Sequence, residues 1–212
     1  MISLSRHSDI MAQRHKDCYN NGTMTTEMTQ ILLDGMRREG WPALAAKHSA
    51  DKGGWTRGGI TARNWGDWRL LGRDATPEEL NAITAPQALD FYFQRYVVLP
   101  KFDLVTDKRL QALLVDWAFT SWSDDPIKAL QTSLARQGML PGAIDGRLGP
   151  KTFIALSRAN VKQTFNNVLA ARIAFYLWLA FDAQTRQFLR DHPTTQLHNA
   201  RGWVNRCLEF LR

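Results

Sequence analysis

The stretch EGWPALAAKHSADKGGWTRGGIT, residues 39–61, decides the fold, because its composition breaks abruptly with the helical pattern before it. Its glycines at positions 53, 54, 58 and 59 disfavour a helix interior and favour a loop with short twisted strands. Glycine in such a strand also lets the backbone approach a ligand closely. The preceding segment predicts a helix from about residue 25, with one apolar face formed by Met28, Ile31, Leu32, Gly35 and Met36.

Beyond residue 61 the signals are helical. The segments 76–79 (TPEE) and 84–87 (TAPQ) each combine a capping box with a proline in the first helical turn, at the first helical position in TPEE. No section alternates enough for a large sheet, so we expect a mainly α chain with one small glycine-rich hairpin. An apolar stripe predicts a further helix through Leu110, Leu113, Leu114, Trp117 and Ala118, and helices are also predicted over 125–137, 150–158, 161–182 and 195–211.

Composition narrows the class of protein. A chain of 212 residues fits one compact domain or two small ones. The net charge of +7 favours polyanionic partners such as an acidic cell wall, but the basic residues are scattered, which argues against a nucleic-acid-binding arm. Cys18 and Cys207 form no disulfide framework and are interpreted as reduced thiols. The histidines lack metal-ligand spacing, so we expect no metal and no cofactor.

The location of the protein follows from its apolar segments. Residues 1–23 are polar and mixed in charge, which indicates a flexible extension and not a signal peptide. The longest apolar stretch, residues 173–181, is too short to span a bilayer and predicts a buried core helix. We therefore expect a protein made in the cytoplasm without a signal peptide and without stable membrane insertion.

Glu39 is the strongest candidate for acid chemistry. It ends a helix with an apolar face, where the negative end of the helix dipole and partial burial both disfavour an ionised carboxyl. A carboxyl kept protonated near neutral pH is what protonation of a glycosidic oxygen requires. The alternative is a surface glutamate in the last helical turn.

Asp51 and Thr56 are candidate partners of Glu39. A hairpin in the glycine-rich segment places a carboxylate and a hydroxyl opposite Glu39, a suitable pair for holding an attacking water. For Asp51 the alternative is a turn-capping residue before Gly53.

The pattern EGW at 39–41 followed by DKGGWTRGGIT at 51–61 resembles the signature of glycoside hydrolase family 108, the N-acetylmuramidases: Glu-Gly-Gly, a spacer, then Asp-x-Gly-Gly-x-Thr-x-x-Gly-Ile-Thr. Residues 116–120 (DWAFT) are similar to its Asp-x-Ala-x-Asn segment. Leu130-Gln131 with 145–152 (DGRLGPKT), and the segment 201–206 (RGWVNR), resemble its predicted peptidoglycan domain. Trp41 replaces a glycine, Thr120 an asparagine and Gly58 an aromatic residue, and the spacer before Gly53 is longer.

The resemblance implies a lysozyme-like α+β catalytic region over residues 24–122, after the extension 1–23. A helical, predicted peptidoglycan-binding region over 123–212 would pack on it. It implies hydrolysis of the β-1,4 bond between N-acetylmuramic acid and N-acetylglucosamine, with Glu39, Asp51 and Thr56 as catalytic residues. The implied substrate-binding residues are Trp41, Trp55, Gly59 and Thr120.

The expected partner is therefore bacterial peptidoglycan, bound by a monomer that reaches the wall after release or dedicated export. A phage or prophage endolysin and a secreted lytic effector both fit, and so do inversion and retention at the anomeric carbon. Two alternatives stay open: a catalytically inactive wall-binding protein on the same scaffold, and a basic nucleic-acid binder.

Overall fold

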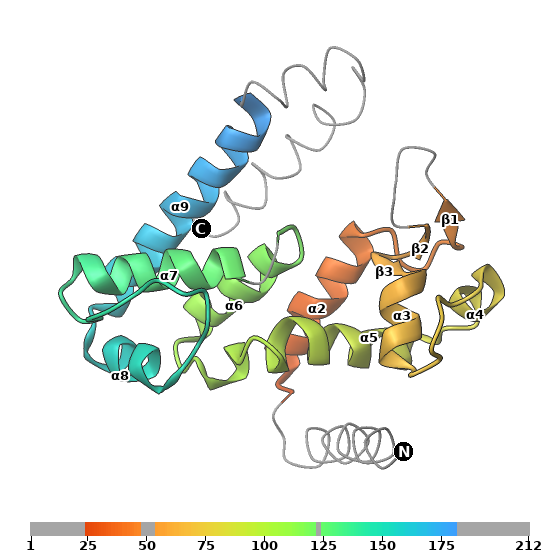
Figure 1. Ribbon diagram of the computed structural model, residues 1–212, viewed down its shortest axis with the longest axis horizontal. Coiled ribbons are helices and arrows are strands. Elements are labelled where there is room, and N and C mark those ends of the chain that lie inside the picture. Colours follow the sequence, from red (N-terminus) through yellow and green to blue (C-terminus); the bar gives the residue numbers. More distant parts are fainter. Residues whose placement is uncertain (1–23, 48–53, 122–123, 182–212) are drawn as a thin grey trace. The chain divides into compact units, whose positions relative to one another are not determined.

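The computed structural model describes residues 24–47, 54–121 and 124–181 (Figure 1). The extension 1–23, both cysteines and the helix predicted over 195–211 lie outside the described residues. The chain divides into two compact units, an N-terminal unit (Met1–Leu99) and a C-terminal unit (Pro100–Arg212). The boundary predicted between the catalytic and peptidoglycan-binding regions, after residue 122, was placed from sequence motifs and not from compactness. It stays a prediction.

Helix α2 (Thr26–Arg38) opens the described part of the N-terminal unit. The Thr25 hydroxyl caps it by accepting from the Met28 amide, and its buried residues confirm the predicted apolar face except at Ile31, which is half-buried. The helix ends in a Schellman motif, in which the Trp41 amide donates to Met36 O and the Gly40 amide to Arg37 O. Gly40 has φ +87°, a conformation that favours glycine.

The sheet is small and antiparallel, in the order β1 (Ala46–Lys47), β2 (Trp55–Arg57), β3 (Ile60–Thr61). Arg57 pairs with Ile60, so only Gly58 and Gly59 form the β2–β3 turn. Their φ angles of +49° and +76° are those of a two-residue type I′ hairpin, which nearly requires glycine. The predicted glycine-rich hairpin is confirmed.

The described part of the N-terminal unit contains three further helices: α3 (Ala62–Trp68), α4 (Pro77–Asn81) and α5 (Ala85–Phe93). Helix α5 continues into a π-helical turn, η1 (Gln94–Val98). Both predicted capping boxes are present, at Thr76 with Glu79 and at Thr84 with Gln87. The Trp65 and Trp68 rings stack 4.9 Å apart and both contact Phe91, which makes this aromatic cluster part of the core.

Arg57 ties the hairpin to the rest of the N-terminal unit. Its side chain is buried, and its guanidinium donates to the carbonyls of Ala43, Leu80 and Ile83 at 2.8–3.1 Å, as well as to those of Asn81 and Pro42. The same guanidinium lies 4.3 Å from the centre of the Trp41 ring. One buried cation thus connects β2, the 41–43 segment and the end of α4.

The C-terminal unit is helical where described: η2 (Phe102–Leu104), α6 (Lys108–Ala118), α7 (Asp124–Arg136), α8 (Pro150–Arg158) and α9 (Val161–Phe181). Helix α9 packs along α7 and α6 (Figure 1). The predicted α6 stripe is fully buried, from Leu110 to Ala118. A mainly α, lysozyme-like architecture with one small sheet is therefore confirmed.

The end of α9 corrects one prediction. Residues 173–181 were predicted to form a buried core helix, but Leu177 and Trp178 are 48% and 60% exposed, while Tyr176 is buried. The stretch is apolar on all sides, yet a helix that packs on its neighbours along one side buries only that side. Among the described helices, none has the length and apolar character that crossing a bilayer demands.

Candidate active site

Glu39 occupies the C-cap position of α2, where its own amide donates to Gly35 O at 3.0 Å. The side chain is half-buried. The terminal carbonyls of α2 surround this position with partial negative charge, which favours the protonated carboxyl. Because Gly40 turns the chain away immediately afterwards, Glu39 stands at the point where the helix meets the hairpin.

The hairpin turn lies directly against Glu39. A Cβ atom placed on Gly59 would lie 3.1 Å from Glu39 Cγ and 2.6 Å from the hydroxyl oxygen of Tyr92, so only glycine fits there. On its other side the turn contacts Trp41, whose Cβ would lie 3.0 Å from a Cβ at Gly58. The Tyr92 hydroxyl donates a hydrogen bond to Gly58 O. The predicted approach of the glycine-rich turn to Glu39 is thus present in the structure.

Two tyrosines from one helical segment adjoin this glutamate. Tyr92 on α5 and Tyr96 in the π-helical turn place their ring centres 5.3 Å apart. Burial raises the pKa of both hydroxyls, and the negative charge of Glu39 raises both further, so Glu39 lies within electrostatic reach of each. Both phenols therefore stay neutral and present dipoles, not charges, to the carboxyl.

Of the other predicted catalytic residues, Thr56 lies in the middle of the central strand, paired with Ala46 on one side and Thr61 on the other. Its hydroxyl oxygen is buried and has no hydrogen-bond partner among the described residues. Such an orphaned oxygen is typical of a position that holds a water or a ligand. Asp51 lies outside the described residues.

The predicted substrate-binding tryptophans differ in their surroundings. Trp41 is half-buried, with one ring face under the Arg57 guanidinium. Trp55 is 37% exposed on β2, which leaves part of its indole accessible to a sugar face.

Sequence comparisons agree with this geometry. Residues 34–121 match the family described as Glycosyl hydrolase 108, and residues 125–208 match the Predicted Peptidoglycan domain. The chain therefore contains a domain of glycosyl hydrolase family 108, over residues 34–121. It is a glycoside hydrolase that acts on peptidoglycan, joined to a peptidoglycan-binding domain.

A solved structure described as "Structure of Brucella abortus SagA" is similar to this hydrolase. The TM-score is 0.59 at 23% identity, and the match covers 91% of the hydrolase and 97% of the other chain. At this identity the likeness concerns the fold. No curated protein matches the sequence.

Thr120 belongs to the C-terminal unit of the hydrolase, where it joins a polar network. Its hydroxyl lies 2.5 Å from that of Tyr176, and the Tyr176 oxygen also accepts from the Arg172 guanidinium at 3.2 Å. Arg172 in turn forms a buried ion pair with Asp116 at 2.6 Å. Burial alone would lower the pKa of Arg172, but Asp116 and Tyr176 outweigh it and the pKa is raised. The DWAFT segment is thus anchored by a buried charge pair.

Sequence reasoning missed Tyr92, Tyr96 and Arg57. The two tyrosines carry a signal, an i, i+4 aromatic pair on one helix face, but that spacing is also typical of core residues. Arg57 carries none, because an arginine in a short strand normally faces solvent. The described residues contain no group of three or more His, Cys, Asp or Glu placed to hold a metal.

Proposed function

We propose that this hydrolase is an N-acetylmuramidase, which cleaves the β-1,4 bond between N-acetylmuramic acid and N-acetylglucosamine with Glu39 as general acid. One observation carries the proposal: Glu39 stands at the C-cap of α2, packed against the Gly58–Gly59 turn and beside the phenols of the buried Tyr92 and the half-buried Tyr96. The negative end of the helix dipole and partial burial favour a neutral carboxyl, which a proton donor to the leaving oxygen needs.

On the opposite side of the scissile bond, Thr56 and Asp51 hold the attacking water or stabilise the cationic transition state. The buried, unpartnered Thr56 hydroxyl supports this role, because a water bound there would satisfy it. Trp55 and Trp41 line the sugar subsites, where indole faces stack on the apolar faces of pyranose rings. The net charge of +7 draws the enzyme to an anionic wall.

The central test is Glu39→Gln, which keeps the shape of the side chain and removes its proton. Turbidity loss of purified peptidoglycan should slow at least about a hundredfold, the lower range for removal of a general acid. Glu78→Gln is the matched control, because Glu78 is exposed in the first turn of α4 and should retain lysis. Unchanged lysis by the Glu39 variant would remove the acid assignment.

The bond is tested separately by mass spectrometry of the released fragments after borohydride reduction. A muramidase leaves N-acetylmuramitol at the reduced ends. Reduced N-acetylglucosamine ends would assign the other glycosidic bond. Binding to insoluble peptidoglycan without any released reducing ends would identify a wall-binding protein on this scaffold.

Thr56→Val tests the water-holding role, because it replaces the buried hydroxyl with a methyl group of similar size. We expect slower lysis with little change in melting temperature, since the hydroxyl makes no hydrogen bond within the described structure. A large drop in melting temperature would instead assign Thr56 a structural role.

We further propose that the enzyme acts as a monomer on the wall, reached after release or dedicated export, as a phage or prophage endolysin or as a secreted lytic effector. Expression in a Gram-negative host with and without an added periplasmic leader tests the delivery step. Lysis only with the leader supports the need for export, whereas lysis without it would indicate that the chain crosses the membrane unaided.

A further inference from the structure

The C-terminal unit contains a cavity at a loop that the proposed catalysis does not use. A cavity of about 660 Å³ opens between the start of this unit and the loop that joins α7 to α8. Its volume lies in the range of about 300–1,000 Å³ that is typical of small-ligand sites. Every residue that lines it belongs to the C-terminal unit.

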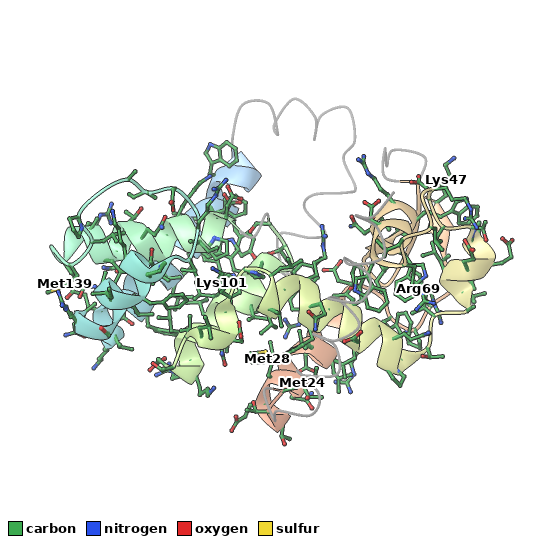
Figure 2. All side chains as sticks on the ribbon, turned by 60° about the horizontal axis from the view of Figure 1, so that its bottom comes forward. Met24, Met28, Lys47, Arg69, Lys101 and Met139 are labelled. Carbon is green, nitrogen blue, oxygen red and sulfur yellow. The ribbon has the colours of Figure 1, made fainter. Side chains whose placement is uncertain are left out.

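The charges that line this cavity are uneven. Lys101, Arg147 and Lys151 contribute three exposed cations, against the single carboxylate of Asp145. None of the three forms a salt bridge within the described part of the chain. Lys101 (Figure 2) lies near Asp103, and Arg147 lies near Asp145. In each pair the charge of the cation is the smallest of the causes that act on the pKa of the carboxyl. The cavity therefore offers cationic side chains that are available to a ligand.

The side chain of Gln131 on α7 holds the loop that carries these charges. Gln131 on α7 is 2% exposed, and its side-chain amide donates to Asp145 Oδ1 at 2.8 Å and to Arg147 O at 3.0 Å. Its carbonyl oxygen accepts from the Gly146 amide at 2.9 Å. Gly146 has φ +72°, and a Cβ there would lie 2.9 Å from Asp124 Cβ, so the turn packs closely against α7. A buried amide thus fixes the Asp145 carboxylate and the backbone of Arg147 in place, which preorganises the loop.

Apolar residues complete the lining. Leu140 and Leu148 are buried at the cavity wall, and Pro141 adds an exposed apolar surface beside them. A ligand that suits this wall combines carboxylates for the cations, one ammonium group for Asp145 and small apolar side chains for the leucines and the proline. Hydrogen bonds and ion pairs then orient the ligand, while the apolar wall contributes burial.

We propose that this cavity binds a short acidic peptide with a free ammonium group, the chemistry of a peptidoglycan stem peptide, and so anchors the enzyme to peptide-bearing wall. The inference rests on the proposed function for the identity of the wall, but it concerns a different site and a binding step, not cleavage. A sugar chain without the peptide has only the lactyl carboxylate of N-acetylmuramic acid and lacks the ammonium group, so it is expected to bind poorly. Inorganic phosphate lacks both the ammonium and the apolar groups.

The test is binding of purified soluble fragments to the full-length chain carrying Glu39→Gln, measured by calorimetry and by NMR shifts of the amides of residues 140–152. A disaccharide with its stem peptide should bind and shift those amides. The same disaccharide without the peptide, and inorganic phosphate at equal concentration, should not. Equal binding of the peptide-free disaccharide or of phosphate would overturn the proposal.

Substitutions that remove the three cations test whether these side chains bind the peptide. Lys101→Gln, Arg147→Gln and Lys151→Gln should each weaken peptide binding about twofold to fivefold, and the triple variant by about the product of the three. Lys162→Gln, at an exposed position on α9 outside the cavity, is the matched control and should bind as before. Unchanged binding by a triple variant with an unchanged melting curve would overturn the proposal.

The two proposals fail separately. Wall lysis that survives Glu39→Gln removes the catalytic assignment but leaves the calorimetry on the peptide unaffected. If the disaccharide with its stem peptide does not bind more tightly than the peptide-free disaccharide while lysis still depends on Glu39, only the proposed peptide-binding site is disproved.

Discussion

Gly59 lies directly against the side chain of Glu39: a methyl group at position 59 would come within 3.1 Å of Glu39 Cγ and 2.6 Å of the Tyr92 hydroxyl oxygen. The end of α2, the hairpin turn and α5 therefore meet in one volume that has no room for an additional carbon. The placement of the candidate acid depends on this contact, because the turn limits the directions in which the Glu39 side chain can extend.

Gly59→Ala should lower the rate of wall lysis by about tenfold or more, because it displaces the carboxyl from its position. Gly72→Ala is the matched control: Gly72 has a similar φ of +68°, but nothing lies within 4 Å of its added Cβ. Both variants should lose about 1–2 kcal/mol of unfolding free energy from the left-handed backbone, and Gly59→Ala should lose more because its methyl group is crowded. Denaturant titration and lysis assays check this. Equal lysis rates in the two variants would contradict a positioning role for Gly59.

Tyr92→Phe should reduce both stability and lysis, because it removes the donor to Gly58 O and leaves a buried carbonyl unsatisfied, at a cost of about 1–3 kcal/mol. Tyr96→Phe is the comparison, since Tyr96 also adjoins Glu39 but belongs to the π-helical turn. Thermal melting and lysis rates should show the larger loss for Tyr92. A larger loss for Tyr96 would shift the positioning role to the π-helical turn.

Arg57→Lys should destabilise the N-terminal unit by about 3 kcal/mol or more. An ammonium group cannot reproduce the fork of donors that serves the Ala43, Leu80 and Ile83 carbonyls, and it would leave buried acceptors unpaired. Arg63→Lys, at an exposed position on α3, should stay within about 0.5 kcal/mol of the parent. Urea unfolding followed by tryptophan fluorescence measures both, and similar midpoints would show that Arg57 contributes little.

Asp116→Asn should cost about 3–5 kcal/mol, because it leaves the Arg172 charge uncompensated in the interior of the C-terminal unit. Replacing both partners, with Asp116→Leu and Arg172→Met together, should recover much of that loss, since no charge then remains buried. Equilibrium unfolding of the single and double variants provides the comparison. A double variant less stable than Asp116→Asn would mean that the pair contributes more than charge compensation.

Glu79 should titrate far below an ordinary glutamate. The Arg73 guanidinium, at 2.8 Å, and the Thr76 amide hold the pKa of its carboxyl at about 2, against the usual 4.5. Because the pKa is lower in the folded state, the carboxylate favours folding above about pH 4.5, and this contribution disappears as the pH falls towards 2. Carbon-13 NMR of the carboxyl measures the midpoint. Arg73→Gln should raise it, and an unchanged midpoint would assign the shift to the capping box alone.

The described helices were largely predictable because their signals are local. The capping boxes at Thr76 and Thr84 and the stripe on α6 depend on residues three or four positions apart, and the structure has each of them as predicted. The Gly58–Gly59 turn was predictable for the same reason, since its two glycines are neighbours. Helix α9 was predicted with nearly correct bounds but with the wrong exposure, because composition does not say which side of an apolar helix finds a partner.

The candidate site was predictable only in part. Glu39 and the hairpin follow from the order of residues along the chain, whereas the roles of Tyr92 and Arg57 do not. Tyr92 bonds to a carbonyl 34 positions earlier, and Arg57 to carbonyls up to 26 positions later. Contacts at such separations depend on how whole elements pack, and short-range periodicity carries no information about them.

The sequence by itself determined the helices and the tight hairpin, because hydrogen-bond patterns and backbone conformations within a few residues are fixed by the side chains there. It also singled out Glu39 as the candidate acid. Only the tertiary structure decided that two phenols and a glycine turn enclose that acid, and that Gln131 fixes a cationic loop 14–16 residues away along the chain. Those arrangements arise when buried polar groups must find partners, and the partner that satisfies each is chosen by packing in three dimensions.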